Sequence, residues 1–196
     1  MNSLLTRILS RLYRTLFASF YKGLFQKLGS GTAMFRPFRV DGGNGISIGS
    51  KTVFQRGAWL YCCGIDGQSA SLTIGAGCVF GYNNHITAVR NVEIGDNVLT
   101  ANNVYISDNL HGYEDTTKPI MHQPVRFKRA VVLGDGCWIG ENACIIGARI
   151  GKNSVIGANA VVTCDIPDYS VAVGAPAKVI KQFDPHLKKW IAIKTP

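Results

Sequence analysis

Histidine is the residue type in this chain best suited to proton transfer, because imidazole gains and loses a proton near neutral pH. The 196-residue sequence contains four histidines, His85, His111, His122 and His186. A catalytic zinc site needs three protein ligands around one metal, and His85 and His111 lack a convincing third partner. We therefore expect no metal site, and imidazole remains chemically suited to general-base catalysis.

A six-residue repeat occupies most of the chain and must position these histidines. Over 46–162 an apolar residue followed by glycine recurs at multiples of six, as from Ile74-Gly75 to Phe80-Gly81 and from Ile150-Gly151 to Ile156-Gly157, and a small or apolar residue stands four positions later. Six is not a multiple of the helical period, which excludes an amphipathic helix. The period predicts one short strand and one turn per unit, three units per triangular coil, and stacked coils around a continuous core.

Three interruptions break the repeat, at 61–71, at Arg90 and Asn91, and over about 108–130. The third is the longest and lies between two regular coils. Long loops inside a repeat array are usually functional. Because this loop also contains His111, we predict that it is the active-site loop.

Helical patterns are predicted at both ends of the chain. Over 1–28 apolar residues recur in steps of three and four, interrupted by Arg and Lys, and no run reaches the ~20 apolar residues of a membrane span. Two interpretations stay open: this helix packs on its own protein or a partner subunit, or it lies on anionic lipid. Asp184 as N-cap and Pro185 at the first helical position predict a short C-terminal helix. The predicted organisation is an amphipathic helix over 1–30, the repeat domain over 31–181 and a tail helix over 182–196.

The composition limits the class of protein. The chain has 22 glycines, 17% charged residues, 46% apolar residues and a net charge of +9, which is typical of one globular domain with anionic ligands or partners. No known nucleic-acid module is present, so we expect no nucleic-acid partner. The six cysteines match neither a zinc pattern nor a redox motif. Because arginines interrupt the first apolar stretch, we expect no signal peptide, and a cytoplasmic protein with reduced thiols.

Three stretches of the repeat carry a closer resemblance. They read VEIGDNV running into ISDNLHG (92–98 and 106–112), CWIGENA (137–143), and IGANAVVT followed by GAPAKVI (156–163 and 174–180). Over about 46–181 the chain resembles the hexapeptide-repeat acetyltransferase family, most closely the sugar O-acetyltransferases that decorate bacterial surface polysaccharides. The repeat alone specifies only the fold, whereas the loop histidine and the C-terminal segment make the resemblance specific for activity.

The resemblance implies a mainly β protein, a left-handed parallel β-helix that forms a homotrimer and binds acetyl-CoA between neighbouring subunits. It places His111 at the family's catalytic position, as the general base for a sugar hydroxyl of a polysaccharide or lipid-linked glycan. By the repeat register, Asn83, Asn84 and His85 lie at a corner one coil before the loop, and we expect them to bind the acceptor. The positions that match the family's donor site are Trp138, Ala158, Thr163, Lys178 and Lys181.

The chain departs from the family's pattern at three positions. Asn109 stands where relatives often carry a second histidine, and Glu141 stands where a serine is common. Cys164 replaces the usual lysine after Thr163, which removes one expected contact with CoA. We therefore expect this chain to make fewer contacts with CoA than the family's pattern would give.

Two questions stay open at the level of sequence. Glu114, Asp115 or a backbone carbonyl could orient the imidazole of His111. The function could also be N-acetylation of a nucleotide-linked amino sugar, which uses the same fold, donor and histidine, or that of a non-catalytic β-helix scaffold. The loop histidine and the C-terminal donor segment argue against a scaffold. A γ-type carbonic anhydrase shares the fold but would need three histidines around zinc.

Overall fold

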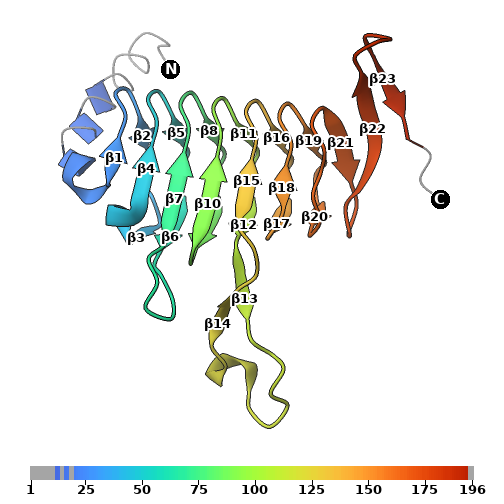
Figure 1. The fold of residues 1–196 in the computed structure, drawn as a ribbon. Helices are drawn as coiled ribbons and strands as arrows, with labels where there is room; N and C mark the ends of the chain where they lie inside the picture. Colours follow the sequence, from blue (N-terminus) through green and yellow to red (C-terminus); the bar gives the residue numbers. More distant parts are fainter. Residues whose placement is uncertain (1–11, 14–15, 18–19, 194–196) are drawn as a thin grey trace.

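The structure, a computed structural model, describes residues 12–13, 16–17 and 20–193. The described part is mainly β, and successive strands pass in turn through three sheets, here called A, B and C. Sheet A contains β1 (Lys27–Leu28), β4 (Ile46–Ile48), β7 (Ser71–Ile74), β10 (Asn91–Ile94), β15 (Val131–Leu133) and β18 (Arg149–Ile150). Each turn through the three sheets is one coil, and the coils stack side by side from the N-terminal to the C-terminal end (Figure 1).

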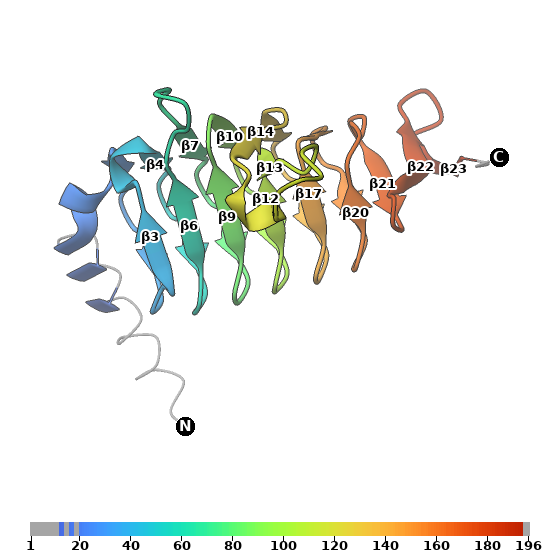
Figure 2. The ribbon, with the colours of Figure 1, turned by 90° about the horizontal axis from the view of Figure 1, so that it is seen from below.

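The other two sheets complete the coils. Sheet B contains β2 (Ala33–Met34), β5 (Val53–Phe54), β8 (Val79–Phe80), β11 (Leu99–Thr100), β16 (Trp138–Ile139), β19 (Val155–Ile156), β21 (Ser170–Val173), β22 (Lys178–Asp184) and β23 (Lys189–Ala192). Sheet C contains β3 (Arg39–Asp41), β6 (Trp59–Cys62), β9 (His85–Ala88), β12 (Tyr105–Ser107), β17 (Cys144–Ile146) and β20 (Val161–Val162). Figure 2 shows sheet C lengthwise, with strands of successive coils running parallel.

The core is a set of side-chain stacks that run along the coils, one from each sheet. In sheet A the stack contains Ile74, Ile94 and Leu133, which are in register and at most 2% exposed. In sheet B the rings of Phe54 and Phe80 stack with centroids 4.3 Å apart. These are the aliphatic and aromatic residues of the six-residue repeat, so the predicted strand-and-turn unit and its inward face are confirmed.

Small polar side chains fasten one coil to the next at the corner between sheets A and B. The hydroxyl of Thr52 donates to Gly75 O (2.8 Å), and the thiol of Cys137 donates to Gly151 O (3.0 Å). Burial raises the pKa of the Cys137 thiol, which keeps the proton that it donates. All six cysteines are free in the structure.

Asparagines fasten the coils at the corner between sheets B and C. Asn83, Asn103, Asn142 and Asn159 occupy equivalent positions in four successive coils, each with φ between 56° and 58°. The side-chain amide of Asn103 donates to Asn142 Oδ1 (3.1 Å), and that of Asn142 donates to Asn159 Oδ1 (3.2 Å). Asparagine suits this corner because it tolerates the left-handed conformation and bonds its neighbours along the stack.

Replacing Asn142 with alanine is expected to lower the free energy of unfolding by about 1–2 kcal/mol, because alanine loses two amide contacts and resists a positive φ. The matched variant is Asn142→Gly, which loses the same contacts but accepts the backbone conformation. Urea unfolding should rank wild type above glycine and glycine above alanine. An alanine variant as stable as wild type would show that the ladder contributes nothing.

The C-terminal end differs from the prediction. The tail helix predicted over 182–196 is wrong for the described residues, because β22 pairs antiparallel with β21 and β23 and extends sheet B. Asp184 does act as a cap: its Oδ1 accepts the N–H groups of His186 (2.8 Å) and Leu187 (3.0 Å). It caps the tight turn of a hairpin, and Phe183 packs against Trp190 across the two strands. Long-range strand pairing therefore overrides the local helix signal.

The N-terminal helix predicted over 1–30 lies largely outside the described residues. Leu12, Tyr13, Leu16, Phe17, Phe20 and Tyr21 are helical, a short 3-10 helix η1 (Lys22–Leu24) follows, and β1 then joins sheet A. The Tyr13 hydroxyl donates to Met34 O (2.7 Å), and Phe17 is buried in the core. In the described part of the chain, no helix has the length and apolar character that crossing a membrane requires.

Candidate active site

The predicted active-site loop is a hairpin that leaves the coils at the corner between sheets C and A. Its strands are β13 (Asn109–His111) and β14 (Val125–Phe127), which pair antiparallel, with η3 (Ile120–His122) near the tip. Figure 1 shows the hairpin projecting well away from the stack of coils. His111 ends β13 opposite Val125, and its side chain is exposed. The predicted base is therefore presented on an arm outside the core, accessible to a substrate.

A buried carboxylate holds the first strand of the hairpin. Asp108 is fully buried, and its oxygens accept the backbone N–H groups of Val89 (2.9 and 3.1 Å), Arg90 (2.8 Å) and Asn91 (2.9 Å). The amide of Asn109 donates to Asp108 Oδ1 (3.0 Å). Three backbone donors and one side-chain donor thus fix the carboxylate, and with it the point where the hairpin begins.

Asn109, which replaces the second histidine expected from the family, has a structural contact of its own. Its Nδ2 donates to Thr87 Oγ1 (3.3 Å) in the coil before, and its backbone N–H donates to the hydroxyl of Ser107 (3.1 Å). Asn109 therefore connects the start of the hairpin to sheet C.

The returning strand of the hairpin is pinned by basic residues. Lys128 N donates to Asp108 O (2.8 Å), and Lys128 Nζ donates to Ile146 O (3.0 Å) in the next coil. Arg129 forms an ion pair with Asp165. The Arg90 guanidinium lies over the Phe127 ring, 5.9 Å from its centroid, within the range of a cation–π contact. The basic run Arg126-Lys128-Arg129 is therefore largely a set of anchors.

The two carboxylates considered as partners of His111 are bonded elsewhere. Backbone N–H groups and the nearby Arg126 guanidinium, 3.7 Å away, lower the pKa of Glu114. Thr117 and Lys118 lower the pKa of Asp115 through hydrogen bonds. Within the described residues neither carboxylate is hydrogen-bonded to the imidazole. Glu114 and Asp115 order the hairpin in this chain.

The three predicted acceptor residues have three different environments. Asn83 belongs to the asparagine ladder, at the exposed corner between sheets B and C. Asn84 is fully buried, its amide donates to Gly81 O (2.8 Å) and Ala101 O (3.0 Å), and its Oδ1 accepts from Thr100. The acceptor role predicted for Asn84 is therefore wrong, because its polar atoms are already used inside the coil.

His85 lies on the outer face of sheet C in a row of aromatic side chains. Its ring stacks on Trp59 with centroids 4.1 Å apart and an interplanar angle of 2°, and its other neighbour is Tyr105 at 5.2 Å. Partial burial lowers the pKa of His85, so its imidazole is mostly neutral at pH 7. A neutral, half-exposed imidazole beside an aromatic surface keeps His85 as a candidate for acceptor binding.

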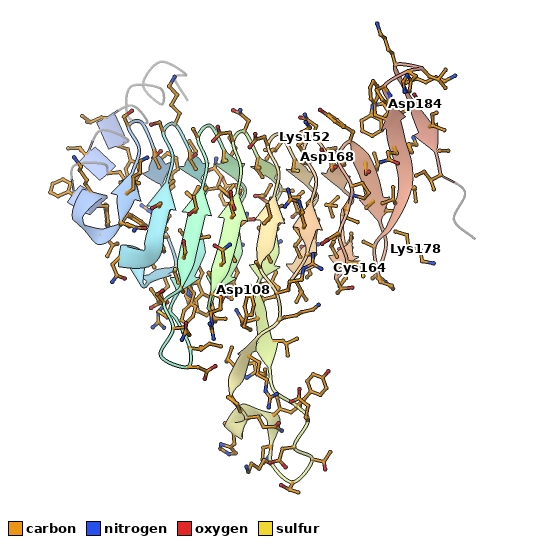
Figure 3. All side chains as sticks on the ribbon, viewed as in Figure 1. Asp108, Lys152, Cys164, Asp168, Lys178 and Asp184 are labelled. Atoms are coloured by element: carbon orange, nitrogen blue, oxygen red, sulfur yellow. The ribbon has the colours of Figure 1, made fainter. Side chains whose placement is uncertain are left out.

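The predicted donor residues spread over two sides of the coils. Trp138 lies on the outer face of sheet B, 51% exposed and in register with Leu99 and Val155. The remaining four are Ala158 at the corner between sheets B and C, Thr163 after β20, and Lys178 and Lys181 in β22, all of them exposed. Figure 3 shows Cys164 and Lys178 along the same edge as Asp108, with Lys152, Asp168 and Asp184 along the opposite edge.

These positions do not meet in one chain. His111 projects from the corner between sheets C and A, whereas Trp138 lies on the outer face of sheet B. Within one chain, the hairpin and the outer face of sheet B therefore lie on different sides of the stack of coils. Within the described residues no cluster of three or more His, Cys, Asp or Glu side chains is arranged to hold a metal ion.

Comparison with known proteins shows which proteins the coils of this chain are similar to. The family model described as a hexapeptide repeat of succinyl-transferase matches residues 71–108 and 130–164, which are the coils on either side of the hairpin. The probable acetyltransferase Rv3034c of Mycobacterium tuberculosis is 44% identical over 118 residues, covering 60% of this chain and 39% of that protein. WbbJ of Escherichia coli, provisionally named a lipopolysaccharide biosynthesis O-acetyl transferase, is 37% identical over 113 residues, covering 54% of this chain and 58% of that protein.

A solved structure shares the fold. AntD, an N-acyltransferase from Bacillus cereus in complex with dTDP and 3-hydroxybutyryl-CoA, superposes with a TM-score of 0.70 at 19% identity, over 86% of this chain and 89% of that chain. The coils of this chain are similar to those of hexapeptide-repeat acetyltransferases. The matched part spans 39% and 58% of the lengths of the two relatives named above.

Proposed function

We propose that this protein is an O-acetyltransferase that moves acetyl from acetyl-CoA to a sugar hydroxyl of a surface polysaccharide or its precursor. The observation that carries the proposal is an exposed histidine on a hairpin whose base is fixed by a buried carboxylate. The chain's similarity to proteins named as acetyltransferases supports the reaction class, and the name of WbbJ supports the class of acceptor.

In the proposed reaction, imidazole of His111 takes the proton of the sugar hydroxyl as its oxygen attacks the thioester carbonyl. A C–O bond forms and the carbonyl electrons move to oxygen, where a backbone N–H would stabilise the charge. When the tetrahedral intermediate collapses, the C–S bond breaks, and the imidazolium returns the proton to the leaving thiolate. The products are the sugar ester and CoA, and neutral imidazole is restored.

We propose that the site lies between neighbouring subunits of a homotrimer of left-handed β-helices. The outer face of sheet B supports this arrangement, because it presents a row of exposed apolar side chains that includes Val79, Leu99 and Trp138. The equivalent row of sheet A is polar at Thr73 and Glu93. An apolar outer face fits a subunit contact and the pantetheine arm of the donor. In this proposal Lys178 and Lys181, both exposed in β22, bind the phosphates of CoA.

The test of this function is a screen of acceptor sugars with acetyl-CoA, with products identified by mass. A mass increase of one acetyl group that mild alkali removes identifies an ester, and hence O-acetylation. An alkali-stable product on an amino sugar would identify N-acetylation instead. A chain that releases no CoA with any acceptor, although it binds acetyl-CoA, would contradict the proposed activity.

We also propose that the enzyme works in the cytoplasm, at the inner face of the membrane, through its N-terminal helix. Tyr13 and Phe17 pack on the first coil, while Leu12, Leu16, Phe20 and Leu24, four residues apart, are exposed, Phe20 by 79%. No acidic residue occurs before Asp41, whereas the same stretch contains several arginines and lysines. An exposed apolar row in a stretch whose charged residues are all basic fits anionic lipid.

Replacing Leu16 and Phe20 with glutamate is expected to reduce flotation with phosphatidylglycerol vesicles several-fold, because both apolar contacts are lost and two negative charges repel the lipid. The control is Leu187→Glu, which changes an exposed leucine at the other end of the coils. Equal recovery of the double variant and wild type with the vesicles would contradict membrane binding by this face.

A further inference from the structure

A pocket of about 570 Å³ opens at the corner between sheets B and C, in the first three coils. It lies at the end of the stack where the N-terminal segment joins (Figures 1 and 2). The hairpin with His111 leaves the stack at a different corner. The residues that line the pocket are Arg36, Pro37, Phe38, Arg56, Gly57 and Asn83.

Two arginines occupy equivalent positions in successive coils of this pocket. Gly57 N donates to Arg36 O (3.1 Å), and Asn83 N donates to Arg56 O (3.0 Å). The turn with Arg56 and Gly57 therefore lies between the turn with Arg36 and the turn with Asn83. Parallel strands are spaced about 4.8 Å apart, a backbone separation across which two side chains as long as arginine can contact one small anion. Both arginines are exposed.

No carboxylate neutralises this pair of charges. All 12 Asp and Glu residues lie within 41–184, which the structure describes, and neither Arg36 nor Arg56 has a carboxylate oxygen within 4.0 Å. Arg39, two residues after the pocket's Pro37, is by contrast paired with Asp41 at 2.8 Å. Like charges held side by side repel each other, and a bound anion would relieve that repulsion.

An aromatic row leads from the pocket along the outer face of sheet C. Phe38 meets Trp59 edge-on at 5.7 Å and is 71% exposed, and Trp59 stacks on His85. Trp59 is held in place because its Nε1 donates to Asp41 Oδ2 (3.1 Å). Ring faces and edges of this kind offer apolar surface next to polar groups, as small-molecule sites require.

We propose that Arg36 and Arg56 bind the phosphate or diphosphate of a phosphorylated sugar acceptor, whose sugar ring lies along Phe38 and Trp59 toward His85. This inference rests on the proposed acetyl transfer to a sugar and specifies the class of acceptor. Arginine suits the role because its planar guanidinium bonds phosphate oxygens in pairs. The shared chemistry fits a nucleotide-linked or a lipid-linked sugar diphosphate.

The first test is calorimetric titration of the intact chain with inorganic pyrophosphate. The double variant Arg36→Gln/Arg56→Gln is expected to bind pyrophosphate at least about tenfold more weakly, because two charge-assisted contacts are lost. The control Lys51→Gln/Arg149→Gln removes the same charge from exposed positions elsewhere, and its affinity should stay within twofold of wild type. This readout needs no turnover, so it stands even if acetyl transfer fails.

The second test compares acceptors that differ in the phosphate and in its carrier. The KM for UDP-glucose or for an isoprenyl diphosphate-linked glucose should rise at least about tenfold in the arginine double variant. The substrate that wild type prefers shows whether the acceptor is a nucleotide-linked or a lipid-linked sugar diphosphate. The KM for methyl glucoside and for acetyl-CoA should not change. Phe38→Ala should weaken binding of the sugar diphosphate but not of pyrophosphate.

Several results would overturn the inference. One is a wild-type chain that does not bind pyrophosphate, and another is equal loss of affinity in the arginine variant and its control. A rise in the KM for acetyl-CoA alone would assign the pocket to the donor. A change of oligomeric state in the arginine variant, measured by light scattering, would assign the pocket to a subunit contact.

Discussion

Replacing His111 with alanine is expected to lower the rate of acetyl transfer roughly 10²–10⁴-fold, the usual contribution of a positioned general base. The side chain lies at the exposed end of β13 and supports no part of the core. The fold, the thermal midpoint and the affinity for acetyl-CoA should therefore remain those of wild type. Steady-state kinetics with the acceptor found in the screen, together with calorimetry for acetyl-CoA, would measure both effects.

The control for this variant is His122→Ala. His122 lies in η3 of the same hairpin and is exposed, so the variant removes an imidazole from the loop without removing the proposed base. We expect its turnover to stay within about twofold of wild type, because exposed substitutions away from the site have small effects. Unchanged turnover in His111→Ala, or an equal loss in His122→Ala, would exclude His111 as the base.

Replacing Asp108 with alanine is expected to lower the free energy of unfolding by about 2–4 kcal/mol, because one buried and two partly buried backbone N–H groups lose their acceptor. Transfer activity should also fall, since the hairpin that presents His111 loses its fixed origin. Urea unfolding would measure the first effect, and KM against kcat would separate a misplaced base from lost substrate binding.

Two variants calibrate the Asp108 result. Asp108→Asn keeps one acceptor oxygen but turns an amide donor toward backbone N–H groups, so we expect an intermediate loss of stability. Asp66→Asn removes the charge of an exposed carboxylate from the loop after β6, at a φ of 54° that asparagine tolerates, and it should change stability by less than about 0.5 kcal/mol. If Asp108→Ala unfolds at the same urea concentration as wild type, the buried carboxylate does not anchor the hairpin.

The coils were predictable because their determinants are local and repeated. Each unit carries its own inward aliphatic residue, small residue and turn, so each strand can be predicted from the residues of its own unit. The C-terminal hairpin was not predictable in this way. Asp184 and Pro185 form a valid helix-start signal, yet β22 lies beside β21 and is held by hydrogen bonds to it. Only the position of the preceding coil decides between helix and strand there.

Interruption of the repeat indicates a candidate site, whereas contacts between coils cannot be predicted from the sequence. The sequence predicts His111 as the base because it lies in the longest gap of the repeat. Asp108 was missed because its partners are 17 to 19 residues away. Asn84 was assigned wrongly although it stands four residues after Phe80, the position that the repeat places inside. The repeat register at that corner therefore indicates that Asn84 faces the core.

The hairpin is inserted without any cost to the pairing of the coils around it. Val92 of β10 pairs with Val131 of β15 across the insertion, 39 residues apart, in the same parallel register that Val92 shares with Leu72 of β7. The supporting stack is thus continuous beneath the arm that carries His111. Evolution could lengthen, shorten or exchange that arm to suit a new acceptor while the underlying scaffold keeps its stability, which makes acceptor choice and folding separable traits in this architecture.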